Sequence, residues 1–535
     1  MGNALCQHQV EDLFCLVVTC GNISHKEREV LVIVDPISTG AVLSAHSVAR
    51  GLNVIAVWSE SVPPELLNFV SKGLSYSFIG AVQHQAGEIQ TTAKAVGQLI
   101  GHATLRGVIV GCETGVLLGD ELSEMLKQRG NGTALSPLRR NKWLQTEAVR
   151  KTGANACTQS LVTSMAEVNS VLQSWPPAYT FKAVVKPCSG AGSDGVTICN
   201  SKQEVRDAFR MLEGTKNVLG LTTYEVLVQE YLVGDEYVVD TVSLDGEHKV
   251  VALWKYDKRI FNGSPVVYYG MRFLAIDDEP ALREMVRYTL GTLDTLGIKN
   301  GCMHSEIKLE PRGPVLIEVN CRIHGGEGTW APLAEACCGY SAVSALLDAW
   351  LDPASFYRLP SVPGELPFVA HAMEAKMRSS VEGTLARIDS AKLGRIRKLS
   401  SYRSEMIAVE LGRPIKKTID AVSACGNVNL VNTDAAQLEA DYAEFHAIVE
   451  SGLFTVEATP KPTAVPSPKT LTSFMAQSPP TSPTLLAFKS FTPSPTATRF
   501  KLDVSEDPAA RPAAPTRMGV GGNGRGPRKP TNSIS

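Results

Sequence analysis

The sequence predicts an α/β protein of several domains that ends in a disordered tail. Its first part alternates strand, loop, helix and strand, which is the pattern of a doubly wound sheet. From residue 181 to 270 the pattern changes to strands joined by tight turns, and after Thr459 the composition changes again. The 535 residues are enough for three or four domains of ordinary size.

The first domain is expected at residues 1–135. Residues 29–35 have the apolar sequence of a buried strand, a helix is expected near 41–50, and a second strand begins at Asn53. A similar strand, loop and helix return at 107–126. Because the sequence has no GxGxxG motif here, we expect a Rossmann-like domain without a dinucleotide site.

The next two units are expected at residues 136–359 and 360–458. Ser136 followed by Pro137 is the pattern of a helix N-cap with proline at the first helical position, so a helical segment is expected over PLRRNKWLQTEAVRKTG. The second of these units is a small mixed α/β subdomain that ends in a helix near 435–451.

The tail, residues 459–535, is dominated by Pro, Ser, Thr and Ala, which predicts disorder because too little apolar surface is available for a core. It carries ten Lys and Arg against three Asp and Glu, a net charge of +7, so the rest of the chain carries −9. A mildly acidic folded part argues against nucleic acid as the main partner. The tail is a candidate segment for binding partners, and its Ser/Thr-Pro pairs are candidate phosphorylation sites.

The twelve cysteines form no CxxC pair, which predicts free thiols in a reducing compartment. No apolar run reaches the length of a membrane span, and we therefore expect a cytoplasmic protein. Gly2 and Cys6 in the start MGNALC are candidate acylation sites that would anchor the chain to a membrane. An unmodified terminus is the favoured interpretation.

The segment HSEIKLEPRGPVLIEVN, residues 304–320, predicts a β-hairpin that carries acidic groups. Its simple register pairs Glu306 with Glu318. The same register pairs His304 with Asn320, and strand alternation puts Asn320 on the face of the two carboxylates. Facing carboxylates repel each other, and a hard cation such as Mg²⁺ removes that repulsion. The alternative is a solvated face. The opposite face is expected in the core and comprises Ile307, Leu309, Ile317 and Val319.

A strand followed by a glycine-rich loop is predicted in VVKPCSGAGSDGV, residues 184–196. The strand delivers Lys186, and the glycines of the loop let backbone N–H groups close on phosphate oxygens. No GK[ST] sequence follows, so the segment is not a P-loop. The alternative interpretation is a flexible turn.

The segment VLVQEYLVGDEYVVD, residues 226–240, predicts two strands around Gly234. Gln229, Glu230 and Leu232 are candidates for contacts with a purine. Glu236 is a candidate for contact with a ribose. The alternative is an ordinary turn with acidic side chains in solvent.

Two further stretches combine basic and aromatic residues. Lys142, in RRNKW, lies in the first turns of an expected helix and by itself indicates only a surface lysine. The stretch WKYDKR, residues 254–259, is either a loop that contacts substrate or phosphate or an ordinary strand end.

The order of these motifs resembles that of the ATP-grasp superfamily. Within it, the chain is similar to the L-amino-acid ligases and carnosine-synthase-like carboxylate–amine ligases. The resemblance covers about residues 29–456 and includes VDPISTG, GCETGVLLGDELS, RRNKW, GCMHSE and IEVNCRIHGG. It implies a two-lobed ATP-grasp domain at 136–359, between the Rossmann-like domain and the C-terminal α/β subdomain.

The resemblance also implies roles for individual residues. Those expected to contact ATP are Lys142, Lys186, Ser189, Gly190, Ala191, Gly192, Ser193, Glu230, Leu232 and Glu236. Those expected to hold Mg²⁺ or Mn²⁺ are Glu306, Glu318 and Asn320. Arg322 is expected beside the acyl-phosphate and, with Lys186, is expected to act in catalysis. Gly325 and Gly326 would let the backbone approach the substrate.

The implied reaction joins a small carboxylate to an amine through an acyl-phosphate and releases ADP and phosphate. Amino acids are candidate substrates, although no residue is matched for binding an amino-acid carboxylate, and a homo-oligomer is a further candidate partner. One alternative is another ATP-grasp enzyme, such as a carboxylase that phosphorylates bicarbonate. The other is a non-catalytic ATP-binding scaffold, against which the three intact metal ligands argue.

Overall fold

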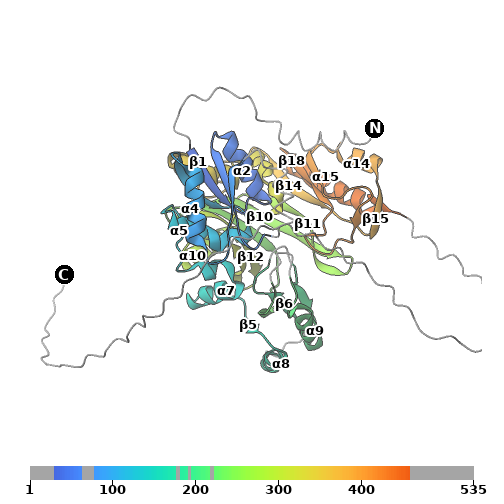
Figure 1. The fold of residues 1–535 in the computed structure, drawn as a ribbon. Coiled ribbons are helices and arrows are strands. Elements are labelled where there is room, and N and C mark those ends of the chain that lie inside the picture. Colours follow the sequence, from blue (N-terminus) through green and yellow to red (C-terminus); the bar gives the residue numbers. More distant parts are fainter. Residues whose placement is uncertain (1–28, 63–77, 176–180, 191–193, 217–221, 458–535) are drawn as a thin grey trace, which may run out of the picture. The chain divides into compact units, whose positions relative to one another are not determined.

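The computed structural model of the chain describes residues 29–62, 78–175, 181–190, 194–216 and 222–457 (Figure 1). The candidate residues that lie outside these ranges are Gly2, Cys6, Ala191, Gly192, Ser193 and those of the tail from Thr459 onward. Cysteines within the ranges are free thiols, most of them buried. No helix in the described part of the chain combines the length and hydropathy that a membrane crossing requires.

The first sheet is parallel and has the strand order β3-β2-β1-β4. Its elements are β1 (Glu29–Val34), α2 (Thr39–Ala49), β2 (Asn53–Trp58), β3 (Phe78–Gln83), α4 (Ile89–Ile100), β4 (Thr104–Val110), the 3₁₀ helix η2 (Glu113–Gly115) and α5 (Val116–Met125). Every residue of β1 and β2 after the first is buried, because helices cover both faces of a parallel sheet. The expected α/β fold with a parallel N-terminal sheet is confirmed.

The helical segment expected after Ser136 is broken into two helices. Helix α6 (Ser136–Arg140) ends at Asn141, and α7 (Lys142–Lys151) begins directly after it. The Asn141 side chain accepts a hydrogen bond from the backbone N–H of Leu144 at 3.1 Å and so caps α7. Ser136 does not cap α6, because its hydroxyl donates to Asp120 instead. The expected helical segment is thus present as two helices, and the expectation that Ser136 is the N-cap was wrong, because Leu135 takes that position.

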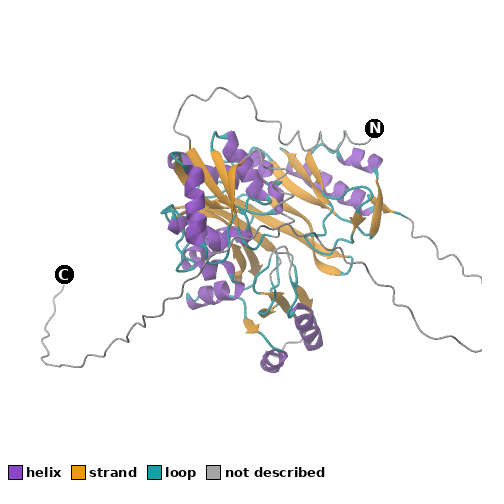
Figure 2. Cartoon of the chain, in the orientation of Figure 1, coloured by secondary structure: helices purple, strands orange, loops and turns teal. Residues whose placement is uncertain are grey.

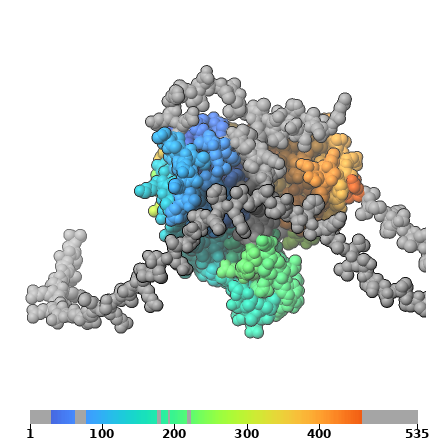
Figure 3. All heavy atoms as spheres, in the orientation of Figure 1, coloured from blue at the N-terminus to red at the C-terminus, as the bar shows by residue number. Residues whose placement is uncertain are grey.

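A smaller antiparallel sheet has the order β5-β8-β6-β7. Its elements are β5 (Gln159–Val162), α8 (Met165–Ser174), β6 (Ala183–Pro187), β7 (Thr197–Cys199), α9 (Lys202–Leu212) and β8 (Val226–Glu230). Helices α8 and α9 lie beside its strands (Figure 2). Their apolar side chains pack with those of the strands in a separate core. In the space-filling view these residues, coloured teal to green, pack closely together (Figure 3).

The central sheet has eight strands in the order β13-β12-β9-β10-β11-β14-β18-β16, all paired antiparallel. Its strands are β9 (Glu236–Leu244), β10 (Glu247–Phe261), β11 (Ser264–Phe273), β12 (Gly301–Glu310), β13 (Gly313–Asn320), β14 (His371–Met377), β16 (Tyr402–Ile407) and β18 (Gly426–Asn432). The helices between them are α10 (Leu282–Thr295), η3 (Gly326–Gly328), α11 (Ala331–Cys338), α12 (Ala342–Leu351) and α13 (Pro353–Arg358). Strand β9 is buried along its whole length, as its central place requires.

The last part of the described chain continues the same sheet. Strands β14, β16 and β18 belong to it, and α15 (Ala435–Glu450) packs against β14 and β18. The remaining elements are β15 (Gly383–Ile388), α14 (Ser390–Ile396), β17 (Pro414–Ile415) and β19 (Phe454–Val456). The expected C-terminal helix is confirmed. One sheet crosses the boundary expected at residue 360, and the division into domains stays a prediction.

Candidate active site

Two lysines approach the site from the side of the smaller sheet. Lys186 lies on β6 and is only 7% exposed. Lys142 is the first residue of α7, because the Asn141 cap starts the helix there. The Lys142 Nζ donates to the carbonyl oxygen of Gly190 at 3.0 Å and lies 2.7 Å from Glu318 Oε2. Lys142 therefore links the glycine-rich segment to the hairpin.

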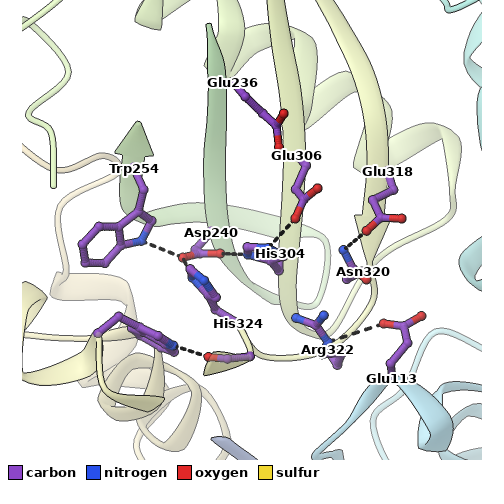
Figure 4. A network of polar contacts seen from close by, with 12 residues as sticks. Glu113, Glu236, Asp240, Trp254, His304, Glu306, Glu318, Asn320, Arg322 and His324 are labelled. Carbon is purple, nitrogen blue, oxygen red and sulfur yellow. Dashed lines mark hydrogen bonds and ion pairs between the residues drawn. The ribbon is translucent and has the colours of Figure 1, made fainter. Parts of the chain in front are cut away.

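Strands β12 and β13 supply the carboxylates. Glu306 pairs with Glu318 and His304 pairs with Asn320, which confirms the predicted register. The Asn320 side-chain amide donates to Glu318 Oε1 at 3.0 Å. Figure 4 shows these side chains on neighbouring strands of the hairpin. Two carboxylates and an amide therefore share one face of the sheet.

The core face of the hairpin differs from the prediction at one position. A register shift follows Glu306, so Ile307 pairs with Leu316 and not with Ile317. The extra residue of this bulge, Ile317, leaves the core face and packs with Leu232 beside the cavity described below. Leu316 takes its place in the core beneath the sheet. The expectation that Ile317 is a core residue was wrong for this reason.

The lysines and carboxylates stabilise one another electrostatically. Burial alone raises the pKa of Glu318, but the ammonium groups of Lys142 and Lys186 outweigh it and bring that pKa to about 2. Burial lowers the pKa of Lys186, and Glu318 opposes this effect. Glu318 is therefore a carboxylate under ordinary conditions, held between two cations.

A second group of charged side chains lies next to Glu318 and its two lysines. Glu236, the first residue of β9, accepts a hydrogen bond from Lys258 of β10, and its other oxygen lies 3.6 Å from Lys308 Nζ. The Lys258 ammonium lies 4.3 Å from the ring centre of Tyr268. Lys308 also donates to the carbonyl oxygen of Gly234 at 2.9 Å. Two cations are thus fixed beside the residue expected to contact a ribose.

The candidate purine contacts follow β8. Glu230 is its last residue and accepts hydrogen bonds from Arg312 at 2.6 Å and from the backbone N–H of Thr158 at 2.8 Å. Leu232, 9% exposed, lies in the loop between β8 and β9. In this loop Gly234 has φ 95°, and a Cβ there would lie 2.1 Å from the carbonyl oxygen of Leu309. Only glycine allows the loop to lie this close to the hairpin.

One cavity of about 340 Å³ gathers most of these side chains. The expected residues that line it are Lys142, Lys186, Gly190, Glu230, Leu232, Glu236, Glu306 and Glu318. Lys258, Tyr268 and Lys308 also line it. Asn320 and Arg322 do not line this cavity. Ser189 does not line it either, although it directly precedes Gly190, which does. The volume is within the range of pockets that hold drug-sized or cofactor-sized ligands.

Arg322 lies beyond the hairpin, next to the parallel sheet. Its Nε is 3.4 Å from Glu113 Oε2, and Arg140 Nη1 is 3.3 Å from Glu113 Oε1. Glu113 belongs to η2, directly after the carboxyl end of β4. The carboxyl edge of a doubly wound sheet is where such folds bind ligands. Arg322 therefore stands between the hairpin and the edge of the parallel sheet.

Four residues of this region were not assigned a role from the sequence. Lys308 could have been found by strand alternation, because it follows His304 and Glu306 at the same spacing. Lys258 lies in the basic and aromatic stretch WKYDKR, whose sequence is compatible with either a ligand loop or an ordinary strand end. Glu113 and Asp240 contact partners far along the chain, and no local pattern indicates those contacts.

A smaller antiparallel sheet and the central sheet thus present lysines and carboxylates to one cavity of nucleotide size. This arrangement is typical of a class of enzymes that bind ATP between two antiparallel sheets. Residues 179–330 match the ATP-grasp domain family. The chain is 33% identical to dapdiamide A synthase of Enterobacter agglomerans over 333 residues, which are 62% of this chain and 75% of that protein.

Two further similarities agree with this. Alanine–anticapsin ligase of Bacillus subtilis (strain 168) is 26% identical over 220 residues, 38% of this chain and 45% of that protein. The crystal structure of L-amino acid ligase from Bacillus licheniformis superposes with a TM-score of 0.63 at 18% identity, covering 81% of this chain and all of that one. The chain belongs to the ATP-grasp ligases, an enzyme family whose members use ATP and magnesium.

Proposed function

We propose that this enzyme joins the carboxylate of one amino-acid-like substrate to the amine of another, with ADP and phosphate as the other products. The observation that carries the proposal is the convergence of Lys142, Lys186, Glu306 and Glu318 on one cavity. Arg322 follows four residues after Glu318. The names of the related ligases favour amino acids as substrates.

The donor set around the hairpin fits magnesium. Glu306 and Glu318 face each other across β12 and β13, and Asn320 lies beside Glu318. Oxygen donors of this kind are those that Mg²⁺ prefers, and Mn²⁺ accepts the same set. In this role the cation would neutralise charge on the phosphates. The Lys142 ammonium now supplies a positive charge to Glu318 at 2.7 Å.

The lysines would bind and neutralise the phosphates of ATP. Lys142, Lys186, Lys258 and Lys308 all line the cavity. Phosphoryl transfer needs mainly positioning and charge neutralisation from the protein, and four ammonium groups around one cavity supply both. Glu230 and Leu232 would then contact the purine, and Glu236 the ribose.

The proposed ligation proceeds in two steps. A carboxylate oxygen of the first substrate attacks the γ-phosphorus, the bond to the β,γ-bridging oxygen breaks, and ADP leaves. The amine of the second substrate attacks the acyl carbon, phosphate leaves, and the nitrogen loses a proton. Arg322, held by Glu113, would stabilise the oxygen that becomes negative as the amine attacks.

The test is ADP release by the full-length enzyme with Mg·ATP and pools of amino acids, combined with mass detection of the product. We expect ADP and amide to form in equal amounts, and only when both a carboxylate and an amine are present. The control variant Glu405→Gln should form as much ADP and amide as the unaltered enzyme, because Glu405 pairs with Arg397 and neither residue lines the cavity. ADP release with bicarbonate alone, or ADP without any amide, would overturn the proposal.

A further inference from the structure

A buried carboxylate lies at the centre of a hydrogen-bond network beneath the candidate site (Figure 4). Asp240 of β9 is 0% exposed. Its Oδ1 accepts a hydrogen bond from His304 Nδ1 at 2.8 Å, and its Oδ2 accepts from His324 Nδ1 at 2.9 Å. The Trp254 indole N–H also donates to Oδ2, at 2.9 Å. These three donors replace the water that a buried carboxylate would otherwise need.

The first branch of the network leads to the metal carboxylates. His304 lies on β12, two residues before Glu306, and its side chain is 4% exposed. Its Nε2 is 3.3 Å from Glu306 Oε1. The His304 ring therefore lies between two carboxylates, and its orientation is fixed by Asp240. Hydrogen-bonded carboxylate–histidine pairs of this kind orient the ligands of metal sites.

The second branch leads to the loop that follows Arg322. The His324 ring stacks on Trp330, with ring centres 5.0 Å apart and planes inclined by 19°. The Trp330 indole N–H donates to the carbonyl oxygen of Gly325 at 2.7 Å, and the Thr39 hydroxyl donates to the same oxygen at 3.0 Å. Asp240 thus fixes His324, and His324 packs on the residue that holds this loop.

Asp240, His304 and His324 are close enough together to hold a metal ion, but their contacts favour another role. Each Nδ1 is already within hydrogen-bond distance of its own Asp240 oxygen. The Trp254 N–H, which can only donate, also points at this carboxylate, and a cation placed there would repel it. The two Nδ1 atoms, the Trp254 N–H and both Asp240 oxygens thus already have hydrogen-bond partners. This arrangement is that of a network that positions side chains.

We propose that Asp240 is a positioning residue that holds Glu306 through His304 and the loop 323–328 through His324. The metal site and the segment expected to approach the substrate would then share one anchor. The inference rests on the proposed function, because it takes Glu306 as a metal ligand. It adds that one buried side chain aligns the phosphate end of the reaction with the acyl end.

Two histidine-to-asparagine changes separate the branches. An asparagine amide reaches the position of a histidine Nδ1, so His304→Asn and His324→Asn each keep a donor for Asp240. His304→Asn removes the Nε2 contact with Glu306, and His324→Asn removes the ring that stacks on Trp330. Both changes also remove the contact between the two histidine rings, whose centres lie 4.0 Å apart, so this shared loss cannot distinguish the branches. Asp240→Asn alters both branches. His446→Asn is the matched control, because His446 is equally buried but contacts Arg378 instead.

Two measurements on the full-length protein read the branches without requiring amide formation. The first is the affinity for Mn²⁺ in the presence of ADP, measured by electron paramagnetic resonance. The second is hydrogen exchange of the backbone amides at 323–330. We expect His304→Asn to weaken Mn²⁺ binding about ten- to hundredfold and leave exchange unchanged. We expect His324→Asn to accelerate exchange at least tenfold and leave Mn²⁺ affinity within threefold.

Asp240→Asn should change both quantities, and the control His446→Asn should change neither, even if it lowers the melting temperature. The proposal is overturned if His304→Asn and His324→Asn change the two quantities equally. It is also overturned if both variants lower only the melting temperature, as a merely structural role predicts. Failure to find substrates would refute the proposed function, but the Mn²⁺ affinities and the exchange rates could still be interpreted. An absence of Mn²⁺ binding by the wild-type protein would refute the metal site itself.

Discussion

The two halves of the central sheet each bury a charged side chain next to a histidine, with opposite results. In the half formed by β9, β10, β12 and β13, His304 lies against Asp240. Burial lowers the pKa of His304, but the hydrogen bond that His304 donates to Asp240 outweighs this effect and raises that pKa to about 9. In the half formed by β11, β14, β16 and β18, burial and the Arg378 guanidinium lower the pKa of His446 to about 3.

The difference lies in what covers each cluster. The first cluster adjoins the carboxylates that line the cavity, so its order serves the site. The second is enclosed between β11, β14 and α15, where Arg378 stacks on Tyr269 at 3.5 Å and donates to His446 at 3.0 Å. Changes in the first half should therefore alter turnover, and changes in the second half should alter stability.

The largest effect is expected for Glu318→Gln. The change removes one negative charge from the proposed metal site and the partner of Lys142. We expect kcat to fall by about 10²–10³-fold, the scale seen when one group that stabilises the transition state is removed. The melting temperature should stay within a few degrees. Steady-state ADP release combined with calorimetry checks this, and wild-type turnover in the variant would show that Glu318 has no such role.

The acid stability of the second half is the next largest effect. His446 has a pKa of about 3 in the folded state and about 6.5 when unfolded, so between these values the unfolded state binds the extra proton. Stability should therefore fall as pH drops through this window, by about 2–3 kcal/mol between pH 7 and pH 4. Urea unfolding at several pH values should show a smaller loss for His446→Asn. Parallel curves for both proteins would contradict the assignment.

Arg322→Lys tests the acyl end of the first half. Lysine keeps the charge but cannot reproduce the fixed guanidinium geometry that contacts Glu113 and the Ile323 carbonyl oxygen. We expect kcat for amide formation to fall about a hundredfold while the KM for ATP changes little. Arg397→Lys is the control, since Arg397 forms an ion pair with Glu405 in the second half. An equal loss in both variants would argue against a role at the acyl group.

The smallest of these effects is expected for Lys186→Met. Methionine fills a similar volume without a charge, and burial already lowers the pKa of this lysine. We expect the KM for ATP to rise about tenfold, because one of four cations around the phosphates is lost. Stability should not fall, because burying an ammonium costs solvation energy. ATP titrations and thermal unfolding measure the two quantities, and an unchanged KM would exclude contact with ATP.

Local patterns predicted much of the fold and part of the site. Strand alternation was sufficient for the register that pairs Glu306 with Glu318, because a turn of fixed position sets it. The bulge at Ile317 was missed, since one extra residue leaves no trace in an alternating pattern. The helix break at Asn141 was missed because Ser136 and Pro137 gave a stronger start signal than the asparagine cap did.

Contacts between distant segments could not be predicted in this way. Asp240 meets His304 and His324 across 64 and 84 residues, and Glu113 meets Arg322 only when the parallel sheet packs near the hairpin. The WKYDKR stretch was recognised as basic and aromatic, but its place on a long strand was needed to bring Lys258 to Glu236. Hydrophobic periodicity and secondary-structure propensity describe single helices and strands. The contacts of these residues depend instead on how the helices and strands pack together.

The ion pair between Lys142 and Glu318 has a consequence for the order in which ligands arrive. A free metal ion would first have to displace an ammonium group held at 2.7 Å, and Lys142 would then lose its partner. A metal that arrives already bound to ATP brings phosphates that can accept Lys142 as the metal takes Glu318. The two cations would exchange partners, and no charge would be left uncompensated during the exchange. Such an enzyme would admit the metal–nucleotide complex as one unit and remain closed to the free ion.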